Sequence, residues 1–355
     1  MRKVLVIEDS ALMRRYISDI LVGAGYKIEY ARDGLQGLEK LIEFSPDVIT
    51  LDINMPKMDG LECLEKIMAT KPTPVVMVSS VTEKGAIATL EALEKGAVDY
   101  VAKPGGSISS NMKEVEQILL AKIKSALSIK VSSSIERKSN ERLRAEKQDL
   151  QKPKIQIPKR SFGAKKFELV LIGVSTGGPS VLQDIIPHIP EGFPVPIVIA
   201  QHMPSRFTQV FSERLNKASN VSVQEISGTL DLQAGNVYIA KGDSDVIISR
   251  RGGKLVAEMH IMDKNHLWHP SVELMVNSAL KATSADNLIC VQLTGMGNDG
   301  ASAMTTANQR GAHTIAESEE TAAVFGMPRE LIQQGGASEI LPNTQILDAL
   351  LRLTK

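Results

Sequence analysis

The chain contains two series of short apolar segments, and a helical pattern separates each segment from the next. In the first series the segments begin 20 to 27 residues apart, which is the spacing of repeated strand–helix units. Strands connected in this way form a parallel sheet that helices cover on both faces, so their residues are apolar nearly throughout. The sequence therefore predicts two α/β domains. The predicted strands are 4–7, 28–30, 48–51, 75–78 and 98–101 in the first domain, and 169–174, 197–200, 237–240 and 288–293 in the second.

The charge distribution separates the two domains. The formal net charge is zero for the whole chain, but it is −1 for residues 1–130, +7 for 131–166 and −6 for 167–355. The middle stretch has few large apolar residues and contains Pro153 and Pro158, so it cannot bury enough surface to offset the entropy lost on ordering. We predict a first domain at 1–125, a basic linker at 126–166 and a second domain at 167–352. Within the last, residues 237–254 carry Gly-Asp and Gly-Gly turn signals and are interpreted as an antiparallel excursion.

Composition excludes several classes of protein. No apolar run approaches the roughly 18 residues needed to cross a bilayer, so we expect no membrane insertion. A net charge of zero argues against a protein that is wholly a nucleic-acid binder, and we predict no nucleic-acid partner. The two cysteines, Cys63 and Cys290, cannot form a disulfide framework, which favours a cytoplasmic location. Both are expected to be packed in the interior and not catalytic.

Charged side chains follow several predicted strands of the first domain. Glu8 and Asp9 follow the first strand, Asp52 the third and Lys103 the fifth, while Ser79 ends the fourth. The carboxyl ends of parallel strands meet at one edge of the sheet, where ligands bind. Three carboxylates brought together repel one another unless a cation lies among them, and Mg²⁺ suits such a set because it also leaves room for phosphate oxygens. The sequence therefore predicts a magnesium and phosphoryl site at this edge.

These motifs resemble the receiver domain of two-component response regulators, which has a flavodoxin-like fold. The matching strings are IEDS at 7–10, LDINMPKMDG at 51–60, VSS at 78–80 and YVAKP at 100–104. The resemblance implies a histidine kinase as phosphodonor. It also implies that Asp52 is phosphorylated. Mg²⁺ would be bound by Asp9, Asp52 and the Asn54 carbonyl, with Glu8 where the family more often has Asp. Lys103 would pair with the phosphoryl group, and Ser79 and Tyr100 would form the switch pair.

In the second domain, Ser175 stands between a strand and a helical pattern, in the string Gly173-Val174-Ser175-Thr176-Gly177. Three functional interpretations are open. The string fits the Gly-x-Ser-x-Gly elbow of α/β-hydrolases, a glycine-rich turn that holds a nucleotide phosphate, or a hydrolase on a different fold. The fourth interpretation is structural, a tight turn with an N-cap serine.

Two further strand ends favour a hydrolase. His202 follows the strand at 197–200, and Asp299 follows the strand at 288–293. A serine nucleophile, a histidine base and an orienting carboxylate are what acyl transfer needs. The chain order is Ser, His, Asp, whereas an α/β-hydrolase would have Ser, Asp, His. The order therefore predicts a convergent catalytic triad rather than the ordinary esterase fold.

The second domain resembles the catalytic domain of the chemotaxis protein-glutamate methylesterases, which also deamidate receptor glutamines. The matching strings are IGVSTGGP at 172–179, QHMP at 201–204, PSV at 270–272, LTGMGNDG at 293–300 and FGMP at 325–328. The resemblance implies a doubly wound, mostly parallel α/β domain acting on methyl-accepting chemotaxis receptors, with no cofactor for the esterase chemistry. It implies Ser175 as nucleophile, His202 as general base, Asp299 as the orienting acid, and the Thr176 and Met296 amides at the oxyanion.

The sequence departs from the methylesterase pattern at several positions. Lys241, Glu273 and Glu317 replace the usual Pro, Asp and Gln, and Ala322-Ala323 replaces Ser-Cys; of these, Lys241 and Glu273 could change the charge at the rim of the site. Two alternatives to a phosphorylation-activated methylesterase remain. One is a non-catalytic, phosphorylation-switched adaptor on the same scaffold, and the other is a transcriptional regulator that uses the basic linker. No helix-turn-helix pattern supports the second.

Overall fold

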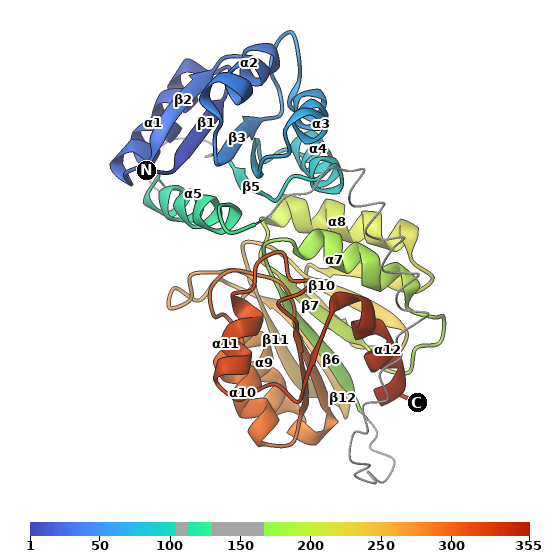
Figure 1. Ribbon diagram of the computed structural model, residues 1–355. Coiled ribbons are helices and arrows are strands. Elements are labelled where there is room, and N and C mark those ends of the chain that lie inside the picture. Colours follow the sequence, from blue (N-terminus) through green and yellow to red (C-terminus); the bar gives the residue numbers. More distant parts are fainter. Residues whose placement is uncertain (104–111, 130–166) are drawn as a thin grey trace, which may run out of the picture. The chain divides into compact units, whose positions relative to one another are not determined.

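The computed structural model describes residues 1–103, 112–129 and 167–355. Most of residues 1–101 belong to one compact unit and residues 167–355 to a second, and each sheet with its helices is described here by itself (Figure 1). Nearly all of the predicted linker at 126–166 lies outside the described residues.

The first unit is a five-stranded sheet with the strand order β2-β1-β3-β4-β5. Strand β1 pairs in parallel with β2 and β3, with Val4 opposite Ile28 and Val48, and β3 pairs in parallel with β4. This order is the flavodoxin-like arrangement, as predicted. The strands are β1 (Lys3–Ile7), β2 (Lys27–Ala31), β3 (Val48–Asp52), β4 (Val75–Ser79) and β5 (Asp99–Ala102), and the helices are α1 (Ala11–Gly23), α2 (Gly34–Phe44), α3 (Gly60–Thr70), α4 (Glu83–Glu94) and α5 (Met112–Ala126).

Helix starts in this unit follow from local side-chain chemistry. Ser10, Asp33 and Asp59 have extended backbones, and their side chains accept hydrogen bonds from the first turns of α1, α2 and α3. Such N-caps satisfy backbone donors that the helix itself leaves unpaired. Each capped helix follows a strand closely, so polar side chains gather at the carboxyl edge while the strands themselves stay buried.

The second unit contains a seven-stranded sheet with the order β15-β14-β13-β6-β7-β10-β8. Every pair in this sheet is parallel, which confirms the predicted doubly wound α/β architecture. Its central strands β13, β6 and β7 are fully buried. The strands are β6 (Leu169–Val174), β7 (Ile197–Gln201), β8 (Ser222–Ile226), β10 (Asn236–Ala240), β13 (Leu288–Gln292), β14 (His313–Glu317) and β15 (Glu339–Leu341).

Helices cover both faces of this sheet. Figure 1 shows α9, α10 and α11 on one face and α7, α8 and α12 on the other. Buried residues of α9, α10 and α11 form one apolar core with the strands. The helices are α7 (Gly178–Ile185), α8 (Ser205–Ala218), α9 (Val272–Ala282), α10 (Ala301–Gln309), α11 (Met327–Gln333) and α12 (Asn343–Leu353), with short 3₁₀ turns η1 (Ile186–His188) and η2 (Ala285–Asn287).

A separate three-stranded antiparallel sheet has the order β11-β12-β9. It comprises β9 (Thr229–Asp231), β11 (Asp245–Arg251) and β12 (Lys254–His260), and Gly252-Gly253 forms the hairpin turn with positive φ at both residues. The predicted excursion at 237–254 was therefore partly wrong, because residues 236–240 pair in parallel within the main sheet. The sequence analysis also missed β8, β9, β14 and β15, whose polar or short sequences lack the apolar runs used to find strands.

Candidate active site

Three adjacent strands of the second unit carry the predicted triad. Ser175 follows β6, His202 follows β7, and Asp299 lies in the loop after β13. Since β13, β6 and β7 are neighbours in a parallel sheet, their carboxyl ends form one edge. Ser175 and His202 are both only 8% exposed. This edge of the sheet therefore holds the Ser175 and His202 side chains, both largely buried from solvent.

The triad histidine bonds directly to the triad carboxylate. The Nε2 atom of His202 lies 2.8 Å from Oδ2 of Asp299, although 97 residues separate them in the chain. The other ring nitrogen, Nδ1, is buried and has no hydrogen-bond partner among the described residues. A neutral imidazole that donates from Nε2 to a carboxylate leaves Nδ1 as its acceptor. The arrangement therefore leaves Nδ1 available to accept a proton, a detail that sequence cannot specify.

Asp299 is also the anion at the N-terminus of α9. Its Oδ2 accepts from the Val272 amide at 2.8 Å, and its Oδ1 accepts from the Glu273 amide at 3.0 Å and the Ser271 hydroxyl at 3.1 Å. Burial acts to raise the pKa of this carboxyl, but the hydrogen bonds from His202 and from the two amides outweigh it, so its pKa is lowered. The carboxylate consequently stays ionised opposite the imidazole.

The nucleophile loop is tied to the loop after β13. The Ser175 amide donates to the Thr294 carbonyl at 2.9 Å, and the Thr294 hydroxyl donates to the Thr176 carbonyl at 2.8 Å. A Cβ atom on Gly295 would lie 2.8 Å from Cβ of Ser175, so only glycine permits this approach. These contacts hold residues 175–176 and 294–295 together.

The structure places Ser175 differently from the N-cap interpretation. The N-cap of α7 is Gly177, with φ of 79° and no side-chain cap, and Pro179 lies in the first turn. Ser175 therefore precedes the cap by two residues and is not used to start the helix. The predicted N-cap role of this serine is wrong.

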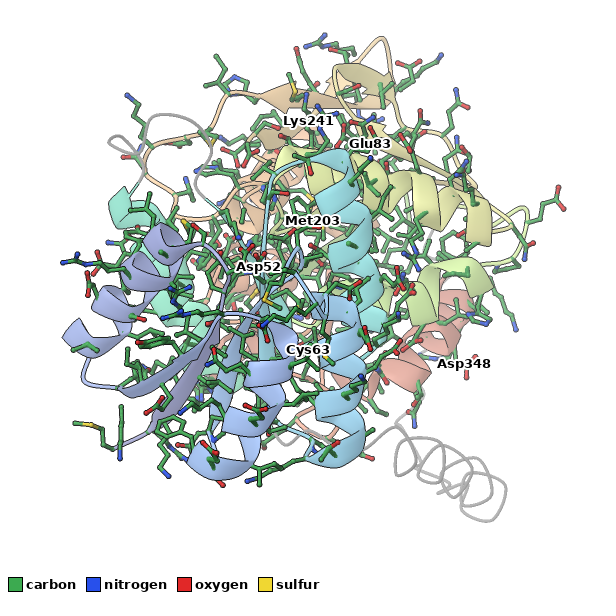
Figure 2. All side chains as sticks on the ribbon, turned by 90° about the horizontal axis from the view of Figure 1, so that it is seen from above. Asp52, Cys63, Glu83, Met203, Lys241 and Asp348 are labelled. Atoms are coloured by element: carbon green, nitrogen blue, oxygen red, sulfur yellow. The ribbon has the colours of Figure 1, made fainter. Side chains whose placement is uncertain are left out.

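The departures from the methylesterase pattern lie in different surroundings. The Glu273 carboxylate accepts from the Ala303 amide at 3.0 Å, near the start of α10. Glu317 is fully buried; burial raises its pKa, and it accepts from the Thr294 amide at 2.8 Å. Lys241 follows β10, the neighbour of β7 (Figure 2). Glu317 was recognisable in the sequence as a departure, but its amide partner depends on the fold.

Trp268 lies at the site and was not among the predicted site residues. Its indole stacks on the His202 imidazole with ring centroids 5.4 Å apart and ring planes within 8°. The one available signal was that this is the single tryptophan of the chain, two residues before the Pro-Ser-Val string.

In the first unit, the predicted acidic cluster is present. Ligand oxygens of Glu8, Asp9 and Asp52 lie within 4.8 Å of one another, and Glu8 and Asp52 are almost completely buried (Asp52 is labelled in Figure 2). Two buried carboxylates and an exposed one at this distance form an oxygen donor set that fits a hard divalent cation. The longer Glu8 side chain does not remove it from the cluster.

The remaining receiver residues occupy strand ends. Ser79 ends β4 and is fully buried, Lys103 follows β5, and Asn54 is exposed two residues beyond β3. Tyr100 in β5 is buried, and the Lys122 ammonium lies 4.8 Å from its ring centroid.

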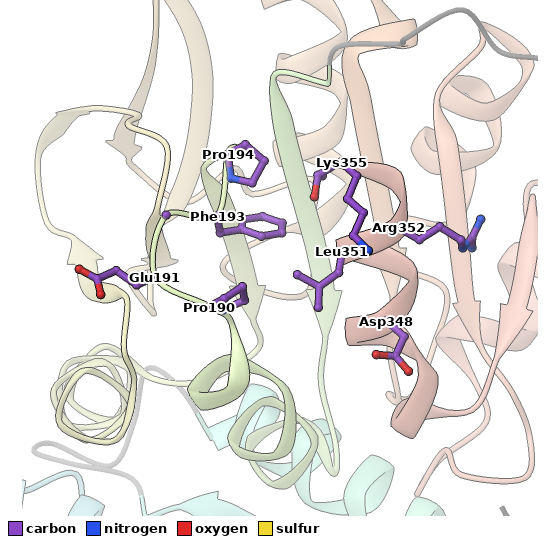
Figure 3. Close-up of a pocket in the computed structure, with 10 residues that line it drawn as sticks. Pro190, Glu191, Phe193, Pro194, Asp348, Leu351, Arg352 and Lys355 are labelled. Atoms are coloured by element: carbon purple, nitrogen blue, oxygen red, sulfur yellow. The ribbon is translucent and has the colours of Figure 1, made fainter. Parts of the chain in front are cut away.

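A hollow of about 680 Å³ lies elsewhere in the second unit (Figure 3). Phe193 and Pro194, which precede β7, lie on one side of it, and Leu351 of α12 lies on the other. Because these residues precede a strand of a parallel sheet, the hollow is at the amino edge, opposite the triad. It is therefore not the reaction site.

Both cysteines are buried, as predicted. Burial raises the pKa of each thiol to about 12, so neither is a thiolate near neutral pH. Within the described residues, no helix has the length and apolarity that crossing a bilayer requires.

Comparison with known proteins agrees with both parts of the chain. Residues 170–350 match the CheB methylesterase family, and residues 4–110 match the response regulator receiver domain. A protein-glutamate methylesterase/protein-glutamine glutaminase of Rhodospirillum rubrum is 47% identical over 99% of this chain and 95% of its own length. One of the same name from Carboxydothermus hydrogenoformans is 45% identical over 99% of both chains.

A solved structure supports the second unit. The CheB methylesterase catalytic domain of Thermotoga maritima superposes with a TM-score of 0.51 at 38% identity, covering 53% of this chain and 99% of that one. Together with the strand-edge geometry, these matches show that the chain belongs to the CheB methylesterase family, with a response-regulator receiver domain preceding the methylesterase domain.

Proposed function

We propose that this chain is a phosphorylation-activated hydrolase that removes methyl groups from γ-glutamyl methyl esters on chemotaxis receptors and deamidates specific receptor glutamines. The observation that carries the proposal is the 2.8 Å hydrogen bond between buried His202 and Asp299, which leaves Nδ1 of His202 without a partner among the described residues. The named activity of the full-length relatives supports the same reaction.

In the acylation step, the Ser175 hydroxyl attacks the ester carbonyl and its proton passes to Nδ1 of His202. The Asp299 carboxylate, held by the α9 amides, stabilises the imidazolium that forms. The Thr176 and Met296 amides donate to the tetrahedral oxyanion, typically a contribution of a few kcal/mol. The imidazolium then returns its proton to the departing methoxide, which leaves as methanol and produces an acyl-serine.

In the second step, water replaces methanol. His202 accepts a proton from water, the hydroxyl oxygen attacks the acyl-serine, and Ser175 leaves with that proton to give the glutamate side chain. A glutamine substrate follows the same path except that ammonia leaves in the first step. One site therefore performs both reactions, because the acyl-enzyme is identical.

Activation belongs to the receiver domain. Asp52 accepts a phosphoryl group from a histidine kinase, with Lys103 to pair with it and Ser79 and Tyr100 to report its presence. Glu8, Asp9, Asp52 and the Asn54 carbonyl would hold Mg²⁺, which when bound offsets negative charge among carboxylates and phosphoryl oxygens. In this proposal the receiver restrains the esterase until Asp52 is phosphorylated.

The non-catalytic adaptor is not supported, because it needs a triad that is present but misaligned. The short hydrogen bond between His202 and Asp299, and the α9 amide that donates to Asp299, indicate that these triad residues are aligned. A test is to follow methanol release from methylated receptors and ammonia release from glutamine-containing receptors with one preparation. His202→Gln is expected to remove both activities, and persistence of either at the wild-type rate would contradict a shared site.

A further inference from the structure

Among the residues that the structure describes, one hydrogen bond fixes the His202 ring. The contact from Nε2 to Asp299 permits the ring to rotate about the N···O direction, and that rotation moves Nδ1. The side-chain torsion that sets the plane of a histidine ring is broad rather than confined to sharp wells. A second contact is therefore needed to keep Nδ1 in one position.

The Trp268 indole supplies a contact of the right kind. It covers one face of the imidazole with the two planes nearly parallel, at 8°. Rotation of His202 about its Nε2 hydrogen bond would tilt the imidazole into the indole. The hydrogen bond to the Asp299 carboxylate thus restrains the position of Nε2, and the stacked indole restrains the orientation of the imidazole plane.

The segment that carries Trp268 is itself anchored to β11. Asp245 is 2% exposed, and its carboxylate accepts from the Asp263 amide at 2.8 Å, from Nδ1 of His269 at 3.0 Å and from the Ser271 amide at 2.8 Å. These three contacts lie on both sides of Trp268 in the chain. One buried carboxylate therefore fixes both ends of the segment 263–271.

We propose that Trp268 is a positioning residue for the general base, and that Asp245 acts through it by anchoring the segment that presents the indole. The inference rests on the proposed function, in which Nδ1 of His202 takes the Ser175 proton. Trp268 holds the imidazole plane so that this nitrogen stays directed at the nucleophile. It touches His202 but does not exchange a proton.

The kinetic test uses the full-length chain with a small-molecule phosphodonor and methylated receptor membranes. Trp268→Leu, which keeps an apolar side chain but removes the flat ring, should lower kcat about 100-fold and leave KM within about threefold. Trp268→Phe, the matched control, should recover most of kcat because it keeps an aromatic plane. Wild-type kcat in Trp268→Leu, or an equal loss in both variants, would overturn the proposal.

A double-mutant comparison of Asp245→Asn with Trp268→Leu tests the role of Asp245. If its carboxylate acts through Trp268, Asp245→Asn lowers kcat alone but adds little in a chain that already carries Trp268→Leu. Fully multiplicative losses would show that Asp245 acts by another route and would overturn this part of the proposal.

A spectroscopic test does not depend on turnover. Trp268 is the single tryptophan, so the emission of the folded protein reports on this one ring. His202→Gln should change its emission intensity, whereas His188→Gln, at an exposed histidine bonded to the Asp184 carbonyl, should not. Unchanged emission in His202→Gln would refute the stack. Turnover retained in Ser175→Ala would instead refute the proposed function.

Discussion

Replacing Asp299 by asparagine tests the local geometry of the triad most severely. Its Oδ2 accepts from His202 and the Val272 amide, and its Oδ1 accepts from Ser271 and the Glu273 amide. An asparagine side chain has one oxygen that accepts and one NH₂ group that only donates. In either orientation, the NH₂ group meets one backbone N–H of α9.

The magnitudes follow from that conflict. A buried donor left without an acceptor costs about 1–3 kcal/mol, and the lost charge at the helix N-terminus adds about 0.3–1 kcal/mol. For a domain of this size, 2 kcal/mol corresponds to a fall in Tm of roughly 4–8 °C. If NH₂ faces Nε2, the His202 proton moves to Nδ1 and the base is lost; the same change in a serine-protease triad lowers kcat about 10⁴-fold. In the other orientation the charge opposite the imidazolium is lost.

We therefore expect Asp299→Asn to lower kcat by at least about 100-fold and to lower the Tm of the methylesterase domain. Methanol release from methylated receptors measures the first effect, and calorimetry measures the second. Ser175→Ala serves as the control that should lose activity without a comparable fall in Tm. Full activity in Asp299→Asn, or an unchanged Tm, would refute the assignment of this carboxylate to both roles.

Three further predictions concern other parts of the chain. Asp52→Asn should abolish stimulation of esterase activity by a small-molecule phosphodonor while leaving unstimulated activity intact; stimulation that persists would exclude Asp52 as the acceptor. The His313 hydrogen bond, then the Arg352 ion pair, lower the pKa of Glu339 to about 2 despite its partial burial. Its stabilising effect is therefore complete above the unfolded pKa of about 4.3 and disappears toward pH 2, so Glu339→Gln should lower Tm at pH 7 and progressively less at pH 4 and 3. If the Tm difference between the wild type and Glu339→Gln stayed the same at all three pH values, the lowered pKa of Glu339 would not be its cause. Cys63→Ala combined with Cys290→Ala should retain kcat, and inactivity of the folded double variant would show that a thiol takes part.

The fold was predictable to the extent that strands are buried on both faces. The apolar runs of β1, β3 and β4 and of β6, β7 and β13 identify the centres of both sheets because nothing polar is tolerated there. Strand β14 reads His-Thr-Ile-Ala-Glu and ends in the buried Glu317. Its two polar ends find partners in Glu339 and the Thr294 amide, contacts that depend on the tertiary fold.

The candidate site, like the fold, could be predicted from the sequence only in part. The positions of Ser175, His202 and Asp299 relative to strand ends follow from the order of elements, so their convergence could be predicted. The choice of Nε2 for the carboxylate could not, because it depends on ring orientation. Nor could the Trp268 stack, since the segment that carries it is positioned by Asp245 from the separate antiparallel sheet.

The most direct measurement of the central claim is methanol release from methylated receptor membranes, for the wild-type chain and for Ser175→Ala, each with and without phosphodonor. The account predicts release by the wild type that rises with phosphodonor, and no release above the enzyme-free rate by Ser175→Ala in either condition. Release by Ser175→Ala at a rate near that of the wild type would contradict the serine mechanism.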